Sequence, residues 1–442
     1  MTMDITIHPH ALTGSIRAVA SKSAAHRLLV LAALAPTTTN LDCNSSSDDI
    51  EATVSCLEAL GARIARTRVG FRVKPLPCRT GGDQGFPARS GAVLDCGESG
   101  STLRFLLPVG CALGAQMRLT GHGRLASRPL SPLYEELVAH GARLSEKGRL
   151  PLEVAGKLRG GSFFIPGDVS SQYASGLLMA APLLEGPTSI VVGEPIESRP
   201  YIDVTLEALR DFGVEVACAR EAGAGGDVRR SVFTVPAAAQ LASPGTAVVE
   251  GDWSNSAFWL AAAAMGGDVA VEGLRMDSPQ GDRAVLAALA AFGARVRRGG
   301  TSAACAHDHL QGRTIDVSDI PDLVPPLAAV ASIAEGSTRI VGAARLRLKE
   351  SDRLETVCAA LAALGADIRV EADGLAVSGR PTLSGGEVDA ANDHRIAMMA
   401  AIAAAHATGS TTIHGAECVS KSYPRFFEDF TLLGGIAEER ED

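Results

Sequence analysis

The stretch "LEALGARI" at residues 57–64 has five counterparts along the chain, and this repetition decides the fold. In each copy a leucine-rich segment runs into a glycine and then into a short strand-like run. Glycine at this place is typical of the C′ position of a helix, where the backbone takes a left-handed conformation. We therefore expect each copy to be the end of a surface helix followed by a β-strand. The counterparts are "LVAHGARL" (137–144), "ALRDFGVEV" (208–216), "LAAFGARV" (289–296), "LAALGADI" (361–368) and "FTLLGGI" (430–436), and the six glycines are Gly61, Gly141, Gly213, Gly293, Gly365 and Gly434.

A second segment, almost wholly apolar, precedes each copy. A helix that is apolar all round is buried on all sides, so these segments predict six central helices. The repeat is then a strand, a buried helix, a strand, a surface helix and two paired strands, with a period of roughly 70 to 80 residues. Six such repeats predict an α/β protein of two lobes with three repeats each. The apolar segments are "AAHRLLVLAALA" (24–35), "STLRFLLPVGCALG" (101–114), "YASGLLMAAPLL" (173–184), "SAFWLAAAAMGG" (256–267), "LVPPLAAVASIA" (323–334) and "HRIAMMAAIAAA" (394–405).

The length of the chain agrees with two lobes, because 442 residues are too many for one ordinary core. A stretch with proline and glycine at 236–252 lies about where the fourth repeat starts, and we expect the chain to cross between lobes there. We predict a discontinuous lobe I of residues 1–20 plus 241–442 and a lobe II of residues 21–240. The stretch "RTGGDQGFPARSGA" at 79–92 is expected to be a hairpin loop inside a lobe.

Composition excludes several classes of protein. Hydrophobic residues make up 46% and charged residues 21% of the chain, which is typical of globular proteins. The formal net charge of −9 argues against nucleic acid or an anionic membrane as the principal partner, so any anion site must be concentrated. Neither G-x-x-x-x-G-K-[ST] nor G-x-S-x-G occurs, which disfavours a P-loop nucleotide site and a serine hydrolase.

The N-terminal residues and the cysteines predict the cellular compartment of the protein. The N-terminal residues have neither the basic nor the apolar region of a secretory signal, and the longest apolar runs are shorter than the roughly 18 residues that span a bilayer. Nine cysteines without a Cys-x-x-Cys pair indicate free thiols in a reducing compartment. We therefore expect a cytoplasmic protein. His307 and His309 lack further ligands nearby, so we expect a loop there and no metal site.

Cations stand at the predicted starts of several helices, where the helix dipole favours anions. They are Lys22, Arg104, Arg353 and Arg395. One cation of this kind carries little weight, but four in different repeats suggest that helix ends converge on a multiply charged anion.

The stretch "LRLKESDRLETV" at 346–357 keeps two readings open. In the first, Ser351 caps a helix that begins near residue 352, and Asp352 and Glu355 screen Arg353 on a solvated face. In the second, an anion lies between Lys349 and Arg353, which would share one helix face if the turn is helical from residue 349. Ser23 and Arg27 have the same spacing.

Nine motifs, in this order, resemble the enolpyruvyl transferase family, and within it the branch that acts on shikimate 3-phosphate. They are "SKSAAHR", "ESGSTLR", "ASRPL", "SSQYASGLL", "ESRPYID", "DIPDLVP", "LKESDRL", "NDHRIAM" and "CVSKSYPRF", and they extend from Ser21 through Lys421. The resemblance implies an inside-out α/β barrel in each lobe, with three βαβαββ units, and an active site in the cleft between the lobes. It implies a monomer that needs no metal or organic cofactor and binds two small molecules, shikimate 3-phosphate and phosphoenolpyruvate.

The reaction implied by the resemblance is attack of the 5-hydroxyl of shikimate 3-phosphate on C2 of phosphoenolpyruvate, followed by loss of phosphate. Asp322 would be the base, and Glu350 would protonate C3 and later remove a proton from it, with Lys22 stabilising the charge. Shikimate 3-phosphate would be held by Lys22, Ser23, Arg27, Ser170, Ser171, Gln172, Ser198, Tyr201, Asp322 and Lys349. Phosphoenolpyruvate would be held by Lys22, Gly100, Arg128, Gln172, Arg353, Arg395 and Lys421.

One motif departs from the family pattern, because Glu98, Ser99 and Gly100 stand where many members have Asn-Ala-Gly. Glu98 brings an acidic group beside a polyanion site, and it either faces away or pairs with a cation such as Arg104. In this family the inhibitor glyphosate occupies the phosphoenolpyruvate position, so Glu98 bears on inhibition as well.

Two alternative functions stay open. The first is transfer of enolpyruvate to UDP-N-acetylglucosamine, for which Lys-Asn is typical where this chain has Lys22 and Ser23. The second is a non-catalytic anion-binding protein on the same fold, which could lose the carboxylates that Asp322 and Glu350 supply here. Release of phosphate from phosphoenolpyruvate with either acceptor distinguishes them.

Overall fold

The computed structural model describes residues 3–77, 91–222, 229–237 and 239–440, and the chain divides into two compact units. Unit 1 is Met1–Ser21 with Glu250–Asp442, and unit 2 is Lys22–Val249. The second crossing therefore falls after residue 249, later than the expected boundary at 240. The reason is that strand β14 (Thr246–Val248) pairs in parallel with β3 (Thr39–Asp42) and so completes a sheet of unit 2. The predicted loop at 79–92 lies outside the described residues up to residue 90.

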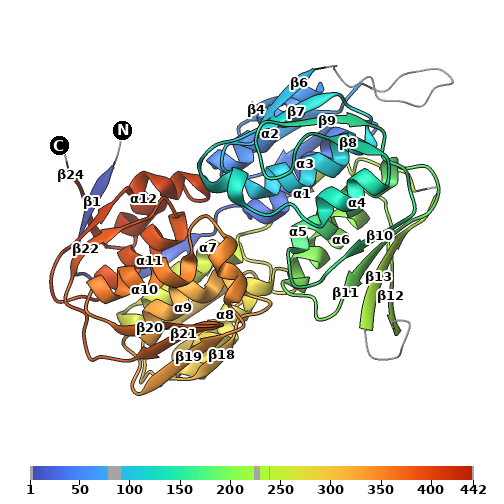
Figure 1. Ribbon diagram of the computed structural model, residues 1–442. Helices are drawn as coiled ribbons and strands as arrows, with labels where there is room; N and C mark the ends of the chain where they lie inside the picture. The colour runs from blue at the N-terminus through green and yellow to red at the C-terminus, as the bar shows by residue number, and fades with distance from the viewer. Residues whose placement is uncertain (1–2, 78–90, 223–228, 238, 441–442) are drawn as a thin grey trace. The chain divides into compact units, whose positions relative to one another are not determined.

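Unit 2 forms three four-stranded sheets in its described part, with helices inside and sheets outside (Figure 1). The sheets are β14-β3-β5-β4, β6-β7-β9-β8 and β10-β11-β13-β12. The further strands are β4 (Arg63–Thr67), β5 (Gly70–Lys74), β6 (Ala92–Asp95), β7 (Met117–Thr120), β8 (Ala142–Leu144), β9 (Leu152–Gly156), β10 (Ser162–Ile165), β11 (Thr188–Gly193), β12 (Ala217–Ala222) and β13 (Arg229–Val235). The helices are α1 (Lys22–Leu34), α2 (Asp48–Leu60), α3 (Gly100–Ala112), α4 (Leu133–Ala139), α5 (Ser171–Ala180) and α6 (Arg199–Asp211), with short 3-10 turns η1 (Gly123–Ser127) and η2 (Ala181–Leu183).

Unit 1 has the same construction, with the sheets β16-β17-β15-β2, β18-β19-β21-β20 and β22-β23-β1-β24 (Figure 1). Its strands are β1 (Asp4–His8), β2 (Thr13–Arg17), β15 (Asp268–Glu272), β16 (Arg295–Arg298), β17 (Ser302–Ala306), β18 (Thr314–Asp316), β19 (Ser337–Val341), β20 (Asp367–Glu371), β21 (Gly374–Ser378), β22 (Gly386–Asp389), β23 (Thr411–His414) and β24 (Ile436–Arg440). Its helices are α7 (Trp253–Gly266), α8 (Val285–Phe292), α9 (Val324–Ala331), α10 (Arg353–Ala363), α11 (His394–Ala404) and α12 (Phe426–Leu432), with 3-10 turns η3 (Gly281–Ala284), η4 (Pro321–Leu323), η5 (Ala344–Leu348) and η6 (Ala416–Lys421).

Every sheet has one parallel pair of strands at one edge and two antiparallel pairs, which confirms the predicted βαβαββ repeat. In the second sheet of unit 2, for example, Ala92 of β6 is in register with Met117 of β7, and Met117 with Val154 of β9. Distant parts of the chain complete other sheets: β2 pairs with β15, and β1 lies between β23 and β24. The first strands of the chain are therefore built into sheets whose remaining strands come from the second half of the sequence.

The core consists of the helices that were predicted to be apolar all round. Every residue of α9 and α11 is buried, as is nearly all of α7, where Trp259 stacks on Phe426 with ring centroids 4.7 Å apart. No helix in the described ranges is long and apolar enough to cross a membrane.

The six marker glycines all have positive φ angles, between 80° and 119°. Gly61 shows what this achieves, because its N–H bonds to the carbonyls of Leu57 and Glu58 and ends α2. The predicted left-handed helix ends are confirmed, and they turn each surface helix into the strand pair that follows.

Candidate active site

The candidate residues fall into two groups, one in each unit. In unit 1 the group centres on Arg353, the first residue of α10, whose side chain is 2% exposed. Its guanidinium binds three carboxylates: Nη1 lies 2.9 Å from Asp322 Oδ1, Nη2 lies 2.6 Å from Glu350 Oε2, and Nε lies 2.8 Å from Asp393 Oδ2. One arginine thus holds both of the carboxylates that the sequence assigned to proton transfer.

Asp322 lies in the short turn η4 and is surrounded by cations. Besides Arg353, Arg395 Nη2 lies 3.0 Å from its Oδ2, and Lys349 Nζ lies 3.7 Å from its Oδ1. Burial alone would raise the pKa of Asp322, but Arg395, Lys349 and Arg353 outweigh it and hold this pKa well below its usual range. Burial lowers the pKa of Lys349 to about 8, although Asp322 opposes this effect.

These contacts exclude the solvated reading of Arg353 and correct two local predictions. The N-cap of α10 is Asp352, which accepts from the N–H of Glu355; Ser351 instead donates to Asp393 Oδ2 at 3.0 Å. The pairing expected between Arg353 and the acids Asp352 and Glu355 is made by Arg347, at 3.1 and 3.2 Å.

Lys349 and Arg353 do not share a helix face, because Lys349 has an extended backbone and α10 begins only at residue 353. Their common partner Asp322 brings them together instead. Helix periodicity could not predict that Lys349 and Arg353 lie close together, because both contact Asp322, about thirty positions earlier in the chain.

Asp393 is the main residue of unit 1 that sequence reasoning missed. It is fully buried, caps α11 by accepting from the N–H of Arg395, and binds Arg353 through both oxygens, at 2.8 and 3.2 Å. Its place before an apolar helix indicated a cap, and the cap is real, but nothing local indicated the second partner. Lys421, at the end of η6, donates to the carbonyl and the side-chain oxygen of Asn392, both at 2.7 Å.

In unit 2 the group centres on the N-terminus of α3, whose first residue is Gly100. A methyl carbon placed on Gly100 would lie 2.8 Å from Arg104 Nη1 and 2.9 Å from Arg128 Nη1. Two guanidinium groups therefore meet at the start of this helix. Like charges at this spacing repel, and an anion between them would remove that cost.

Gln172 connects this point to α5. Its Oε1 accepts from Arg104 Nη1 at 2.8 Å, and its Nε2 donates to Ser101 Oγ at 2.9 Å. Ser170 is the N-cap of α5, and Ser171 is its first residue and is largely buried. Ser170 therefore caps α5 while Gln172, two residues later, joins the group at the start of α3.

Arg27 is buried to 1% exposure on α1 and holds protein groups that carry no charge. Its Nε donates to Thr205 Oγ1 at 2.6 Å, its Nη1 to the carbonyl of Ser23 at 2.6 Å, and its Nη2 to the carbonyl of Tyr201 at 2.9 Å and to Ser175 Oγ at 3.3 Å. Burial lowers the pKa of Arg27 to about 9. The expected proximity of Ser23, Arg27 and Tyr201 is present, whereas Thr205 and Ser175 were not foreseen.

Lys22 and Ser198 complete the unit 2 group. Lys22 is the first residue of α1, and its Nζ lies 2.7 Å from Asp49 Oδ2 on α2. Ser198 precedes α6 with φ of 55°, a left-handed conformation that is uncommon for a residue other than glycine and is often found at functional sites.

Glu98 packs against Gly123, and its Oε1 lies 4.0 Å from His122 Nδ1. Arg104, the cation considered as its partner, donates to Gln172 and to the carbonyl of Pro129 at 3.1 Å. The carboxylate is thus placed toward the turn η1.

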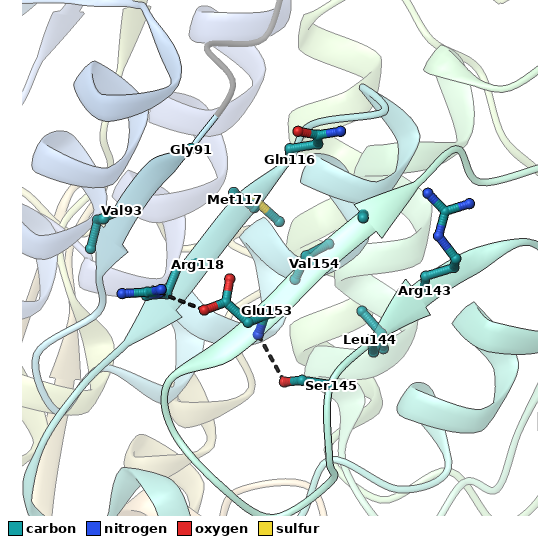
Figure 2. A pocket seen from close by; sticks show the side chains of 11 residues that line it. Gly91, Val93, Gln116, Met117, Arg118, Arg143, Leu144, Ser145, Glu153 and Val154 are labelled. Carbon is teal, nitrogen blue, oxygen red and sulfur yellow. Dashed lines mark hydrogen bonds and ion pairs between the residues drawn. The ribbon is translucent and has the colours of Figure 1, made fainter.

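A pocket of about 610 Å³ lies on the sheet of β6 to β9, where Arg118 pairs with Glu153 at 2.6 Å, but none of the candidate residues lines it (Figure 2). Within the described residues no three His, Cys, Asp or Glu side chains form a metal-binding cluster, and His309 lies 3.0 Å from Glu335.

Comparisons with known proteins show the family of this chain. A family model for EPSP synthase (3-phosphoshikimate 1-carboxyvinyltransferase) matches residues 7–430. The proteins named 3-phosphoshikimate 1-carboxyvinyltransferase from Clostridium kluyveri and Clostridium acetobutylicum are each 38% identical to this chain, over 436 and 443 residues, and each alignment covers 98% of both chains. An EPSP synthase structure from Acinetobacter baumannii has a TM-score of 0.79 with 28% identity and covers 100% of both chains. The chain therefore belongs to the EPSP synthase family of enolpyruvyl transferases, with the inside-out α/β fold of that family.

Proposed function

We propose that this chain transfers the enolpyruvyl group of phosphoenolpyruvate to the 5-hydroxyl of shikimate 3-phosphate and releases phosphate, as a step of aromatic amino-acid biosynthesis. The observation that carries the proposal is that Asp322 and Glu350 bind the same buried arginine, Arg353. The reaction needs one carboxylate to take a proton from a hydroxyl and another to give a proton to carbon. A shared arginine keeps two such groups at a defined spacing.

In the proposed mechanism Asp322 removes the proton of the 5-hydroxyl of shikimate 3-phosphate. At the same time the hydroxyl oxygen forms a bond to C2 of phosphoenolpyruvate. Glu350 must take up a proton from solvent before this step; in its protonated form it gives that proton to C3, which yields a tetrahedral intermediate that still carries phosphate. The C2–O bond to phosphate then breaks, and Glu350 takes a proton back from C3 as the double bond re-forms. No outside oxidant or cofactor is required, because phosphate is the leaving group.

The low pKa of Asp322 makes it a weak base before the substrates bind. Arg395 and Lys349, two of the cations that lower it, are proposed to bind phosphoenolpyruvate and shikimate 3-phosphate, respectively. Anionic substrates on these cations offset their charge, which raises the basicity of Asp322 when the hydroxyl is in place. This coupling supports substrate-dependent activation of the base.

The unit 2 group is proposed to hold the substrates. Ser23, Arg27, Ser170, Ser171, Ser198 and Tyr201 would bind shikimate 3-phosphate; Gly100 and Arg128 would bind phosphoenolpyruvate; Gln172 would touch both. An anion is the natural ligand of Arg27, because the protein groups that it holds are neutral. Lys22 would stabilise the carboxylate and the departing phosphate.

The chain is further proposed to act as a monomer in the cytoplasm, with two small molecules as its partners. The described cysteines are free thiols, six of them buried, which is typical of a reducing compartment. Light scattering on the purified chain measures the oligomeric state, and a dimer mass would contradict this part of the proposal.

The test of the function is phosphate release from phosphoenolpyruvate with shikimate 3-phosphate as acceptor, with the product identified by mass spectrometry. We expect turnover with this acceptor and none with UDP-N-acetylglucosamine. Turnover only with the nucleotide sugar would identify the sister activity, and binding of both anions without turnover would identify a non-catalytic protein.

A further inference from the structure

A chain of hydrogen bonds runs through the interior of unit 2 from His26 to Ser99, the residue before the candidate ligand Gly100. His26 Nδ1 lies 2.7 Å from Thr53 Oγ1, which lies 2.7 Å from Thr102 Oγ1, which in turn lies 2.8 Å from Ser99 Oγ. The four residues come from α1, α2, α3 and the N-cap of α3, and none is more than 1% exposed. Buried polar chains of this kind rigidify the elements that they join.

The direction of the hydrogen bonds follows from the acceptors at the far end. Thr102 has one hydroxyl hydrogen, and its acceptors are Ser99 Oγ at 2.8 Å and the carbonyl of Asp49 at 3.4 Å. Thr102 therefore accepts from Thr53, and Thr53 accepts from the Nδ1–H of His26. This direction of the hydrogen bonds places the proton of the neutral His26 ring on Nδ1.

His26 acts as a permanent donor. Its Nε2 is buried and has no hydrogen-bond partner, so a second proton there would leave an N–H without an acceptor. Burial, with the charges of Lys22 and Arg27, lowers the pKa of His26 well below its usual range. Both the buried Nε2 and the lowered pKa favour a neutral imidazole with its one proton on Nδ1.

Ser99, at one end of this hydrogen-bond chain, and Thr102 beside it lie next to groups that the proposed function uses. Ser99 caps α3 and so fixes the backbone of Gly100 and the hydroxyl of Ser101, to which Gln172 donates. Thr102 reaches the carbonyl of Asp49, whose carboxylate holds Lys22 at 2.7 Å. The start of α3 and the Lys22 ammonium are thus tied to one buried network.

We propose that Thr53 and Thr102 are positioning residues, which hold the N-terminus of α3 and Lys22 in the geometry that binds phosphoenolpyruvate. The inference rests on the proposed function. It predicts a larger effect on phosphoenolpyruvate than on shikimate 3-phosphate. Gly100, at the start of α3, is proposed for phosphoenolpyruvate, whereas the groups proposed for shikimate 3-phosphate around Arg27 are held by Thr205 and Ser175. Lys22 and Gln172 are proposed to contact both substrates, so a smaller weakening of shikimate 3-phosphate is expected as well.

The test is Thr53→Val, which keeps the shape of the side chain and removes the hydroxyl that links His26 to Thr102. We expect the KM for phosphoenolpyruvate to rise about 10-fold, as for loss of a buried hydrogen bond. The Kd for shikimate 3-phosphate, measured by calorimetry, should rise by a clearly smaller factor, because most of its proposed ligands lie outside this network. Thr53→Ser retains the hydroxyl and should restore the KM to within about 2-fold of the unaltered chain.

Two further variants separate positioning from general damage. Thr188→Val makes the same change at a buried threonine of unit 2 whose hydroxyl has no partner, and it should leave both constants unchanged. Thr102→Val breaks the next link, so it should match Thr53→Val, and the double variant should be no worse than either single one.

Each outcome decides between the claims. If the unaltered chain shows no turnover, the proposed function fails, whatever the variants do. If it turns over and Thr53→Val behaves like Thr188→Val, or weakens both substrates equally, the positioning role is refuted while the function stands. If Thr53→Val does not fold, Thr102→Val carries the same test.

Discussion

Replacing Asp322 with asparagine separates proton transfer from substrate binding. Asp322 faces Arg353 at 2.9 Å, Arg395 at 3.0 Å and Lys349 at 3.7 Å. Together with Glu350 and Asp393, it balances these three cations charge for charge. Asparagine has nearly the same shape, so Asp322→Asn removes the base and leaves one net positive charge.

The expected magnitudes follow from this geometry. Loss of a general base lowers kcat about 10²-fold or more. Two unit charges roughly 7 Å apart interact by about 2 kcal/mol at an effective dielectric constant of about 20. An anionic ligand should therefore bind as well as before or up to about 30-fold more tightly. Part of this gain is lost to Asp282, whose pKa is raised to about 7 by burial and by Asp322, because it ionises more readily once Asp322 is neutral. Removing one member of a buried ion-pair cluster should cost about 3 kcal/mol of unfolding free energy.

The assay combines three measurements on the same variant: kcat from phosphate release, Kd for shikimate 3-phosphate from calorimetry, and unfolding free energy from urea titration. Asp367→Asn is the control, because that aspartate is exposed in the same unit and lies 3.9 Å from Arg380. A fall in kcat of less than 10-fold would refute Asp322 as the base. A loss of ligand affinity as large as the loss of kcat would refute the separation of the two roles.

Three further predictions concern the inhibitor, pH and the repeat. Gly100→Ala places a methyl group 2.8 to 2.9 Å from two arginine nitrogens. At an overpacking cost of about 1–3 kcal/mol, it should weaken glyphosate inhibition roughly 5- to 150-fold, with a smaller rise in the KM for phosphoenolpyruvate. Equal inhibition of the variant and the unaltered chain in a dose series would contradict this. Burial lowers the pKa of Lys349 to about 8, so this lysine is charged below that pH and neutral above it. The Kd for shikimate 3-phosphate should therefore rise as the pH passes 8, and Lys349→Arg should flatten this pH profile. A rise that persists in Lys349→Arg would exclude this lysine as the cause. Gly365→Ala forces a side chain into φ of 86° and should lower the unfolding free energy by about 1–2 kcal/mol in urea, whereas Gly300→Ala, which meets open space, should not.

The repeat could be predicted from the sequence because it rests on local physics. A left-handed residue after a helix favours glycine whatever surrounds it, so Gly61 and Gly434 mark helix ends even though they lie in different units. Helices with no polar face, such as α9 and α11, must be buried on all sides wherever they pack. Period and hydrophobicity were therefore enough for six βαβαββ repeats and their central helices.

Pairings between distant segments could not be predicted in the same way. Strand β14 belongs to unit 2 because it pairs with β3, some two hundred residues earlier, and β1 lies between β23 and β24 at the other end of the chain. No local pattern encodes which strands pair with each other. The residues of a strand show which of its faces is apolar, but they do not show which neighbouring strand completes its hydrogen bonds.

The same division applies to the candidate site. Its cations could be found in the sequence, because a positive side chain at the start of a helix has the wrong sign for the dipole and needs a reason. The sequence could not show which carboxylate forms an ion pair with which cation. Arg353 binds Asp393 and Asp322. The acids closest to Arg353 in the sequence, Asp352 and Glu355, instead bind Arg347. Burial decided this, because an arginine with 2% exposure has lost its water and can only be neutralised by carboxylates that the fold brings to it.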